Sequence, residues 1–359
     1  MTSAVAGCLI VLLSETIGAQ EIDFKRLLNM CQQTAAKSSP PLAQAVANAA
    51  KREHDLFKGH VVDATGRILR FGNVETEVDQ IAKGNPTSPS QIPWRNVLRY
   101  WETLSGKSAA DGGAYGAQTV TYYTGLFDAE EQLSRKKISL QALLKAIGDL
   151  SLPEGNSAAI REALRESVIR ASLSDVAWSA AFVSSVMAQA DVPQNKFQRS
   201  ASHITYIANA VRQSASDLKT PEADNALYRA CDPYAVRPRK GDLICYHRHG
   251  ASSAKPYNPK PGLTLNHSLL QEIATGAAPI SLTHCDVVVD IDRERKKIKL
   301  IGGNVQQAVT ERTLNINRQE VLSTSQGVKF CETYNPYEKG DGANCNLNSQ
   351  SWFVLLQAR

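Results

Sequence analysis

The C-terminal half of the chain, from residue 171 onward, places two helical segments first and strand-like segments after them. The helical segments span residues 178–190 and 203–215, and the apolar, β-branched runs follow a Pro- and Arg-rich stretch at 232–241. A charged turn at 292–297 joins two of these runs and predicts an antiparallel hairpin. Helices followed by strands are typical of α+β domains, so we expect that fold class. The predicted strands are residues 242–247, 284–291, 297–303, 307–316 and 351–357.

The preceding residues, 20–170, indicate a mainly helical N-terminal region. Ser39 and the prolines after it open a helix that continues to residue 57, and Pro93 opens another. Ser139 is a capping residue for a third helix, and the fourth, at 156–172, has apolar residues three or four apart, which predicts one buried face. We therefore expect a helical region over 20–170 and an α+β domain over 171–359.

The first residues, 1–19, have the pattern of a cleavable secretory signal. Residues 4–13 are apolar but too few to span a bilayer, and small residues follow at 17–19. The segment has Glu15 and lacks Lys and Arg, so two alternatives stay open. One is a lipoprotein signal ending at Cys8, and the other is a buried N-terminal helix. We expect a periplasmic, secreted or lipid-anchored protein without a stable membrane span.

The charge and the cysteines narrow the classes of partner and cofactor. The net charge of +5 is mild and spread along the chain, which disfavours nucleic acid. Of the 7 cysteines, Cys8 lies in the signal segment, and an even number in an exported protein permits disulfides. We predict a Cys331–Cys345 pair, and for Cys285 either a buried thiol or a disulfide to Cys245. The spacings match no zinc motif, and His54 and His60 form no metal-binding pattern, so we expect no metal and no cofactor.

Three polar residues occupy positions that suit nucleophilic catalysis. Ser179 lies in the first turn of its predicted helix, where free N–H groups and the helix dipole favour a developing anion. His284 begins a predicted strand, and Asn304 ends the next one. We predict that these residues meet as nucleophile, base and orienting group. Alternatives stay open: Ser179 can be a small packing residue, His284 a strand-end histidine without a role, and Asn304 a residue that tolerates a left-handed turn.

The C-terminal half contains four segments, in order, at residues 177–190, 241–246, 283–291 and 301–309. Together they resemble the core of CHAP-type and NlpC-type papain-like peptidases. The first is similar to their nucleophile helix, the second to their first strand, the third to the strand that carries the catalytic histidine, and the fourth to the strand after it. More narrowly, AWSAAFVS, SASHITYI, GDLIC and HCDVVV resemble the bacterial family called domain of unknown function 2272.

The resemblance implies a papain-like core that carries helices on an antiparallel sheet, with Ser179 in place of the usual cysteine. It also implies an amidase or endopeptidase acting on peptidoglycan. A serine hydroxyl stays protonated and depends entirely on its base, whereas a thiol ionises readily. Two alternatives therefore stay open: an inactive papain-like protein that binds cell wall or a protein partner, and a secreted antibacterial effector.

Other residues near these segments are candidates for binding substrate. Trp178 is expected as a wall of the site or as core, and His203 as a lining or structural residue. Asp286 returns to the face of His284 and can orient it or bind a substrate amine. His247 is expected at the mouth of the cleft. Cys285 points to the opposite face from His284 and is a poor substitute nucleophile.

Overall fold

The computed structural model confirms an α+β fold. It describes residues 22–77, 88–108, 116, 118–125, 133–174, 176–220, 226–248, 270, 273, 283–326 and 346–359. The signal segment 1–19 and the Cys331–Cys345 pair fall outside the described residues, so they stay predictions.

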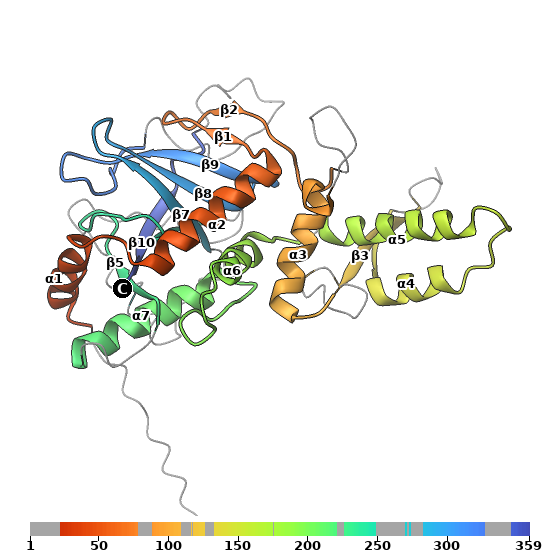
Figure 1. The fold of residues 1–359 in the computed structure, drawn as a ribbon, viewed down its shortest axis with the longest axis horizontal. Helices are drawn as coiled ribbons and strands as arrows, with labels where there is room; N and C mark the ends of the chain where they lie inside the picture. Colours follow the sequence, from red (N-terminus) through yellow and green to blue (C-terminus); the bar gives the residue numbers. More distant parts are fainter. Residues whose placement is uncertain are drawn as a thin grey trace, which may run out of the picture.

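Among the described residues, a large sheet of eight strands forms the core of the main body, to the left in Figure 1. Its order is β2-β1-β9-β8-β7-β6-β10-β5, and its neighbours are antiparallel except for β1 and β9, which are parallel. The predicted hairpin is confirmed as β7 and β8. The strands are β1 Val61–Val62, β2 Ile68–Arg70, β5 Tyr228–Cys231, β6 Leu243–His247, β7 Thr283–Asp292, β8 Lys297–Val305, β9 Ala308–Asn315 and β10 Ser351–Ala358.

Helices α2 and α6 pack on one face of this sheet, and α7 packs beside β5 and β7 (Figure 1). Pro41 occupies the first turn of α2 as predicted, because its missing N–H has no partner to lose there. Small residues such as Ala47 and Ala50 are buried along α2, so the helix can approach the strands closely. The helices are α1 Phe24–Ala35, α2 Pro41–Phe57, the 3₁₀ helix η1 Pro89–Gln91, α3 Pro93–Ser105, α4 Leu140–Gly148, α5 Ser157–Ser174, α6 Ser179–Gln189 and α7 His203–Lys219.

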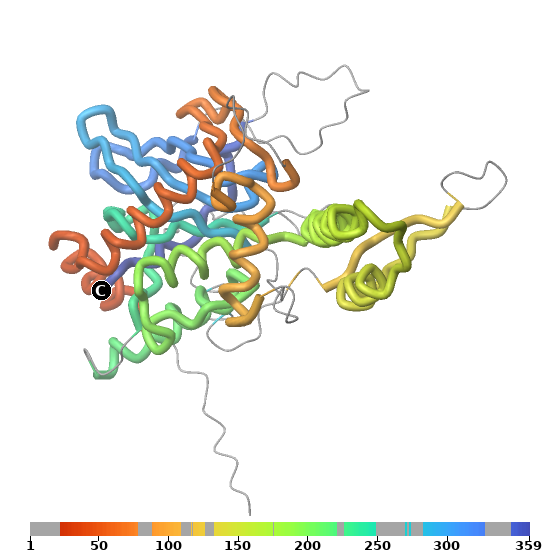
Figure 2. Tube along the Cα trace, turned by 45° about the vertical axis from the view of Figure 1, so that its right-hand side comes forward, coloured from red at the N-terminus to blue at the C-terminus, as the bar shows by residue number. Residues whose placement is uncertain are grey.

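The described residues between α3 and α6 form a projection that extends away from the sheet (Figures 1 and 2). It contains α4, most of α5, and a separate two-stranded sheet of β3 (Thr119–Thr124) and β4 (Ser134–Ser139). The predicted capping of α4 by Ser139 is confirmed. The predicted buried face of α5 is wrong for its first half, where Ile160 and Leu164 are 39% and 37% exposed. The reason is that this half of the helix lies outside the main core.

Two disulfides join distant parts of the described chain. Cys31 on α1 is bonded to Cys231 on β5. Cys245 on β6 is bonded to Cys285, its register partner on β7, which confirms one of the two alternatives for Cys285.

No single described helix is long and apolar enough to cross a membrane, although α5 and α6, bent by 107°, reach the required length and composition as a pair.

Candidate active site

Ser179 is the first residue of α6, a helix that lies in the middle of the core. Its first turns are buried on every side, between α2, α3 and strands β7 and β8. Serine and alanine along this helix allow the close packing, and Phe182 fills the space against Gly303. The first turn of a helix has N–H groups without a partner inside the helix, so Ser179, as the first residue of α6, lies at the positive end of the helix dipole.

The hydroxyl of Ser179 forms a hydrogen bond with an imidazole from the next helix. Its Oγ lies 2.8 Å from Nε2 of His203, the first residue of α7. The other ring nitrogen, Nδ1, is hydrogen-bonded to the hydroxyl of Tyr206, one turn further along. Burial lowers the pKa of His203 well below its ordinary 6.5, and the neighbouring His284 and Arg248 lower it further. His203 is therefore neutral at pH 7, so one of its ring nitrogens carries a hydrogen and the other has a lone pair that can accept a proton.

A second imidazole, that of His284, belongs to a buried charged cluster on the sheet. Its Nε2 lies 2.8 Å from Oδ1 of Asp286, two residues further along β7 on the same face. Oδ2 of Asp286 lies 3.1 Å from Nε of Arg312 on β9, and all three side chains are buried. Burial alone would raise the pKa of Asp286, but Arg312 and His284 outweigh it and hold the pKa below 3.8.

The charged state of Asp286 determines the tautomer of His284. A carboxylate accepts hydrogen bonds only, so Nε2 of His284 carries the hydrogen and Nδ1 is the acceptor. Burial lowers the pKa of His284 to about 4, although Asp286 favours the charged ring. The neutral ring thus presents a lone pair at Nδ1 at pH 7.

Arg248 connects the two halves of the site. This residue follows β6 directly, and one of its terminal nitrogens lies 2.6 Å from Nδ1 of His284 and 3.4 Å from Oγ of Ser179. The rings of His203 and His284 are 5.0 Å apart between centroids. A hydroxyl, two neutral imidazoles, a guanidinium and a paired carboxylate therefore meet at the start of α6. This set of groups can support acyl transfer.

The structure brings most of the predicted site residues together, with different partners. The imidazole in contact with Ser179 is that of His203, and Arg248 lies between Ser179 and His284. Asp286, rather than Asn304, contacts His284. Asn304 has a φ of 55° where the β8–β9 pairing is irregular. This agrees with the alternative prediction that Asn304 is a residue that tolerates a left-handed turn.

The remaining candidates lie at the edge of the cluster or in the core. Trp178 is fully buried and stacks on Phe57, with ring centroids 5.8 Å apart. His247 is partly buried at the end of β6, beside Thr283. Sequence reasoning gave no role to Arg248 or Arg312. The available signal for Arg312 was its place in the alternation of β9, where it falls on the same face as Ala308 and Leu314, because a charge on a buried face needs a partner.

Gly302 on β8 leaves the space that the His284–Asp286 pair occupies. A Cβ atom at this position would lie 1.8 Å from Oδ1 of Asp286 and 2.9 Å from Nε2 of His284. We expect Gly302→Ala to displace the pair and to lower the free energy of unfolding by about 1–3 kcal/mol, as overpacking of a core does. Thermal unfolding and the imidazole ¹⁵N shifts of His284 check this. Gly148→Ala is the control, since its Cβ meets nothing within 4 Å. Unchanged shifts in Gly302→Ala would contradict the expectation.

Glu75 supports the start of α6 from outside the cluster. Its carboxylate accepts a hydrogen bond from the indole Nε1 of Trp178, and its own backbone N–H donates to the carbonyl of Gln307 at 2.8 Å. Burial raises the pKa of Glu75 from 4.5 to about 7, although the indole N–H favours the charged form. The residue before Ser179 is therefore held by a group that titrates near neutral pH.

The raised pKa of Glu75 predicts a pH-dependent stability. Between pH 4.5 and about 7 the folded protein binds this proton and the unfolded chain releases it, so stability falls as the pH rises through this window. Glu75→Gln should remove this part of the slope, as measured by Tm against pH. Glu162→Gln, at an exposed position on α5, is the control. Parallel Tm curves for wild type and Glu75→Gln would show that Glu75 titrates normally.

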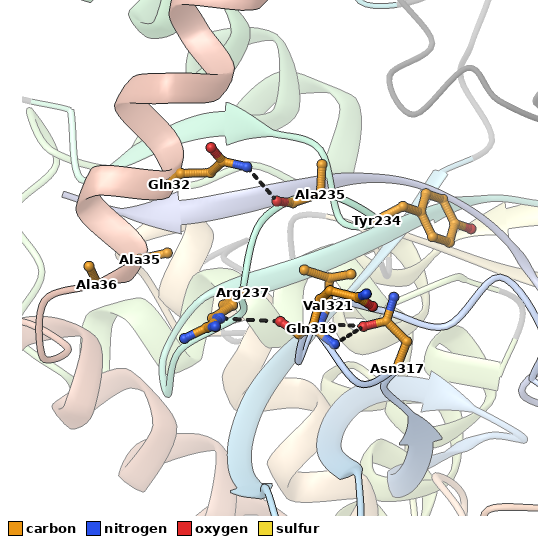
Figure 3. A pocket seen from close by; sticks show the side chains of 9 residues that line it. All are labelled: Gln32, Ala35, Ala36, Tyr234, Ala235, Arg237, Asn317, Gln319 and Val321. Atoms are coloured by element: carbon orange, nitrogen blue, oxygen red, sulfur yellow. Dashed lines mark hydrogen bonds between the residues drawn. The ribbon is translucent and has the colours of Figure 1, made fainter.

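A pocket on another part of the surface is separate from this cluster. It has a volume of about 480 Å³ and lies between α1 and the segments around Tyr234 and Asn317 (Figure 3). Its polar groups are largely bonded to one another: Gln32 donates to the carbonyl of Ala235, and Arg237 donates to that of Gln319. Among the described residues, no three His, Cys, Asp or Glu side chains lie close enough together to hold a metal ion.

The comparison with known proteins gives a family. Residues 147–358 match the model of the family described as "Uncharacterized protein conserved in bacteria (DUF2272)". The match contains Ser179, His203, Arg248 and His284. No curated protein and no solved structure matches the chain. Because the matched residues make up more than half of the chain of 359, the protein belongs to the bacterial family of domain of unknown function 2272.

Proposed function

We propose that the protein is a hydrolase that cuts an amide or peptide bond of peptidoglycan, with Ser179 as the nucleophile. The observation that carries this proposal is the contact of 2.8 Å between Ser179 Oγ and His203 Nε2 at the start of a buried helix. A nucleophilic serine needs an adjacent base, and the helix terminus offers N–H groups to the oxyanion. The resemblance to CHAP-type and NlpC-type papain-like peptidases supports the same location for the nucleophile.

His203 is the base in this proposal. When Nδ1 of His203 carries the hydrogen and donates it to the oxygen of Tyr206, Nε2 accepts the hydroxyl proton of Ser179. Oγ then attacks the carbonyl carbon, and the proton passes from Nε2 to the leaving amine as the C–N bond breaks. Water hydrolyses the acyl-enzyme by the reverse proton transfers.

His284 is the alternative base. Its Nε2 is oriented by Asp286, and its Nδ1 faces the nucleophile through Arg248. Asp286 would stabilise the imidazolium that forms, as an orienting carboxylate does in other hydrolases. Before His284 can act as the base, the hydrogen bond between Arg248 and Nδ1 of His284 has to break. Comparing His203→Gln with His284→Gln separates the two bases: the variant of the true base should lose about 10²–10⁴-fold in kcat.

Export to the cell wall is part of the proposal. The two disulfides, Cys31–Cys231 and Cys245–Cys285, suit an oxidising compartment such as the periplasm. The net charge of +5 suits an anionic wall. The pattern of residues 1–19 supports secretion or a lipid anchor.

The test uses purified mature protein and isolated peptidoglycan, with released fragments identified by mass spectrometry. Wild type should release fragments, and the mass gained should correspond to water added across an amide. Ser179→Ala should release none. Absence of fragments from both wild type and Ser179→Cys, which restores the cysteine of the papain-like enzymes, would reject the hydrolase.

A non-enzymatic wall-binding protein is the second candidate, and Arg248 favours it. The guanidinium is hydrogen-bonded to Nδ1 of His284, so this nitrogen is not available as a base. Ser179 and His284 are also only 4% and 0% exposed. This candidate predicts that the protein sediments with insoluble peptidoglycan and releases no fragments. The Ser179→Ala variant should bind peptidoglycan as well as wild type does.

A further inference from the structure

The charges around Ser179 do not balance among the described residues. Arg248 and Arg312 bring two positive charges to the cluster, while Asp286 brings one negative charge. Both histidines are neutral at pH 7 because burial lowers their pKa. Asp286 is committed to Arg312 and His284, and no ion pair within the described residues joins Arg248 to an acidic side chain.

Among the described residues, the guanidinium of Arg248 therefore donates hydrogen bonds only to neutral groups. The partners are the hydroxyl of Ser179 and the lone pair of His284 Nδ1. A partly buried guanidinium loses hydration and gains little from neutral acceptors, whereas a carboxylate matches its planar donors in a bidentate pair. The cluster is thus complementary to an anion placed beside the nucleophile.

We propose that Arg248 binds a free carboxylate of the substrate, so that the site selects peptides that carry a carboxylate next to the scissile amide. This inference rests on the proposed function and names its substrate class. Arg248 has one terminal nitrogen within 3.4 Å of Ser179 Oγ, so a carboxylate held by it lies within one residue of the attacked carbonyl. Stem peptides with free carboxylates fit this description.

In the alternative in which His284 is the base, carboxylate binding also prepares the site for reaction. A substrate carboxylate competes with His284 for the donors of Arg248 and releases the lone pair at Nδ1. Asp286 holds the hydrogen on Nε2, so the released nitrogen faces the reaction centre as a base. Arg248 is thus a specificity residue that couples recognition of the carboxylate to the availability of His284.

The experiment compares one ligand mixture in two chemical forms. Soluble muropeptides are used either untreated or after conversion of their carboxylates to methylamides. Binding to Ser179→Ala is measured by calorimetry, so that no hydrolysis is needed. The untreated mixture should bind about 10–100-fold more tightly, as expected for a charged hydrogen-bonded pair. In Ser179→Ala/Arg248→Gln the two forms should bind equally weakly, and Arg248→Lys should recover part of the difference.

The matched control is Arg295→Gln, whose side chain is 83% exposed in a turn away from the site. A second readout is the imidazole ¹⁵N shift of His284, which should change on adding untreated muropeptides and not on adding the methylamides. Equal binding of both forms, no binding of either, or an unaltered preference in Arg248→Gln would overturn the proposal. If wild type hydrolyses nothing but the preference persists, the hydrolase fails and the carboxylate site stands. If wild type hydrolyses peptidoglycan and neither Arg248→Gln nor methylamidation changes the rate, the hydrolase stands and the carboxylate site is rejected.

Discussion

Ser179→Ala should lower kcat for release of peptidoglycan fragments by about 10⁴-fold or more, because it removes the atom that forms the acyl-enzyme. The fold should survive. The substitution deletes one hydroxyl and leaves Nε2 of His203 without its partner at 2.8 Å, a loss of about 1–2 kcal/mol in the free energy of unfolding. Fragment release at constant protein concentration, together with denaturant unfolding, measures both effects.

Ser184→Ala is the matched control for this prediction. Ser184 is a buried serine on the same helix, and its hydroxyl donates to the carbonyl of Ser200 at 2.9 Å. Its loss should lower stability by a similar amount and leave activity intact. Wild-type activity in Ser179→Ala would show that Ser179 is a packing residue and that any hydrolysis has another nucleophile.

Asp286→Ala should lower the free energy of unfolding by about 3–5 kcal/mol, since it leaves Arg312 as a buried charge without its carboxylate. It also removes the acceptor for Nε2–H of His284, so the tautomer at Nδ1 is no longer fixed. Urea unfolding measures the stability. The control is Asp290→Asn on the same strand, whose partly exposed pair with Lys240 should contribute no more than about 1 kcal/mol.

A compensating variant separates the charge effect from general damage to β7. Asp286→Ala/Arg312→Met removes both charges and should recover much of the lost stability. The pH dependence has a definite sign: because the pKa of Asp286 is held below 3.8, its stabilising contribution is present above that pH and is lost as the pH falls further. Equal stability of Asp286→Ala and wild type near pH 7 would mean that water or another group compensates Arg312.

Local patterns in the sequence were sufficient for the elements that surround the site. The prolines at the start of α2, the cap of α4 by Ser139 and the charged turn between β7 and β8 all act over a few residues. Strand β5 was missed because it has four residues, too few for a periodic signal. The N-terminal region contributes strands β1 and β2 to the sheet and packs helix α2 on it, which no local pattern indicates.

The amino-acid sequence by itself determined the α+β order, the position of Ser179 at a helix start and the place of His284 and Asp286 on one face of a strand. These properties follow from hydrogen bonding and side-chain direction within single segments. Tertiary structure alone decided that Ser179 contacts His203, 24 residues away, and that Arg248, 69 residues away, lies between it and His284. Such contacts depend on how several elements pack together around a buried charge, and no segment carries that information separately.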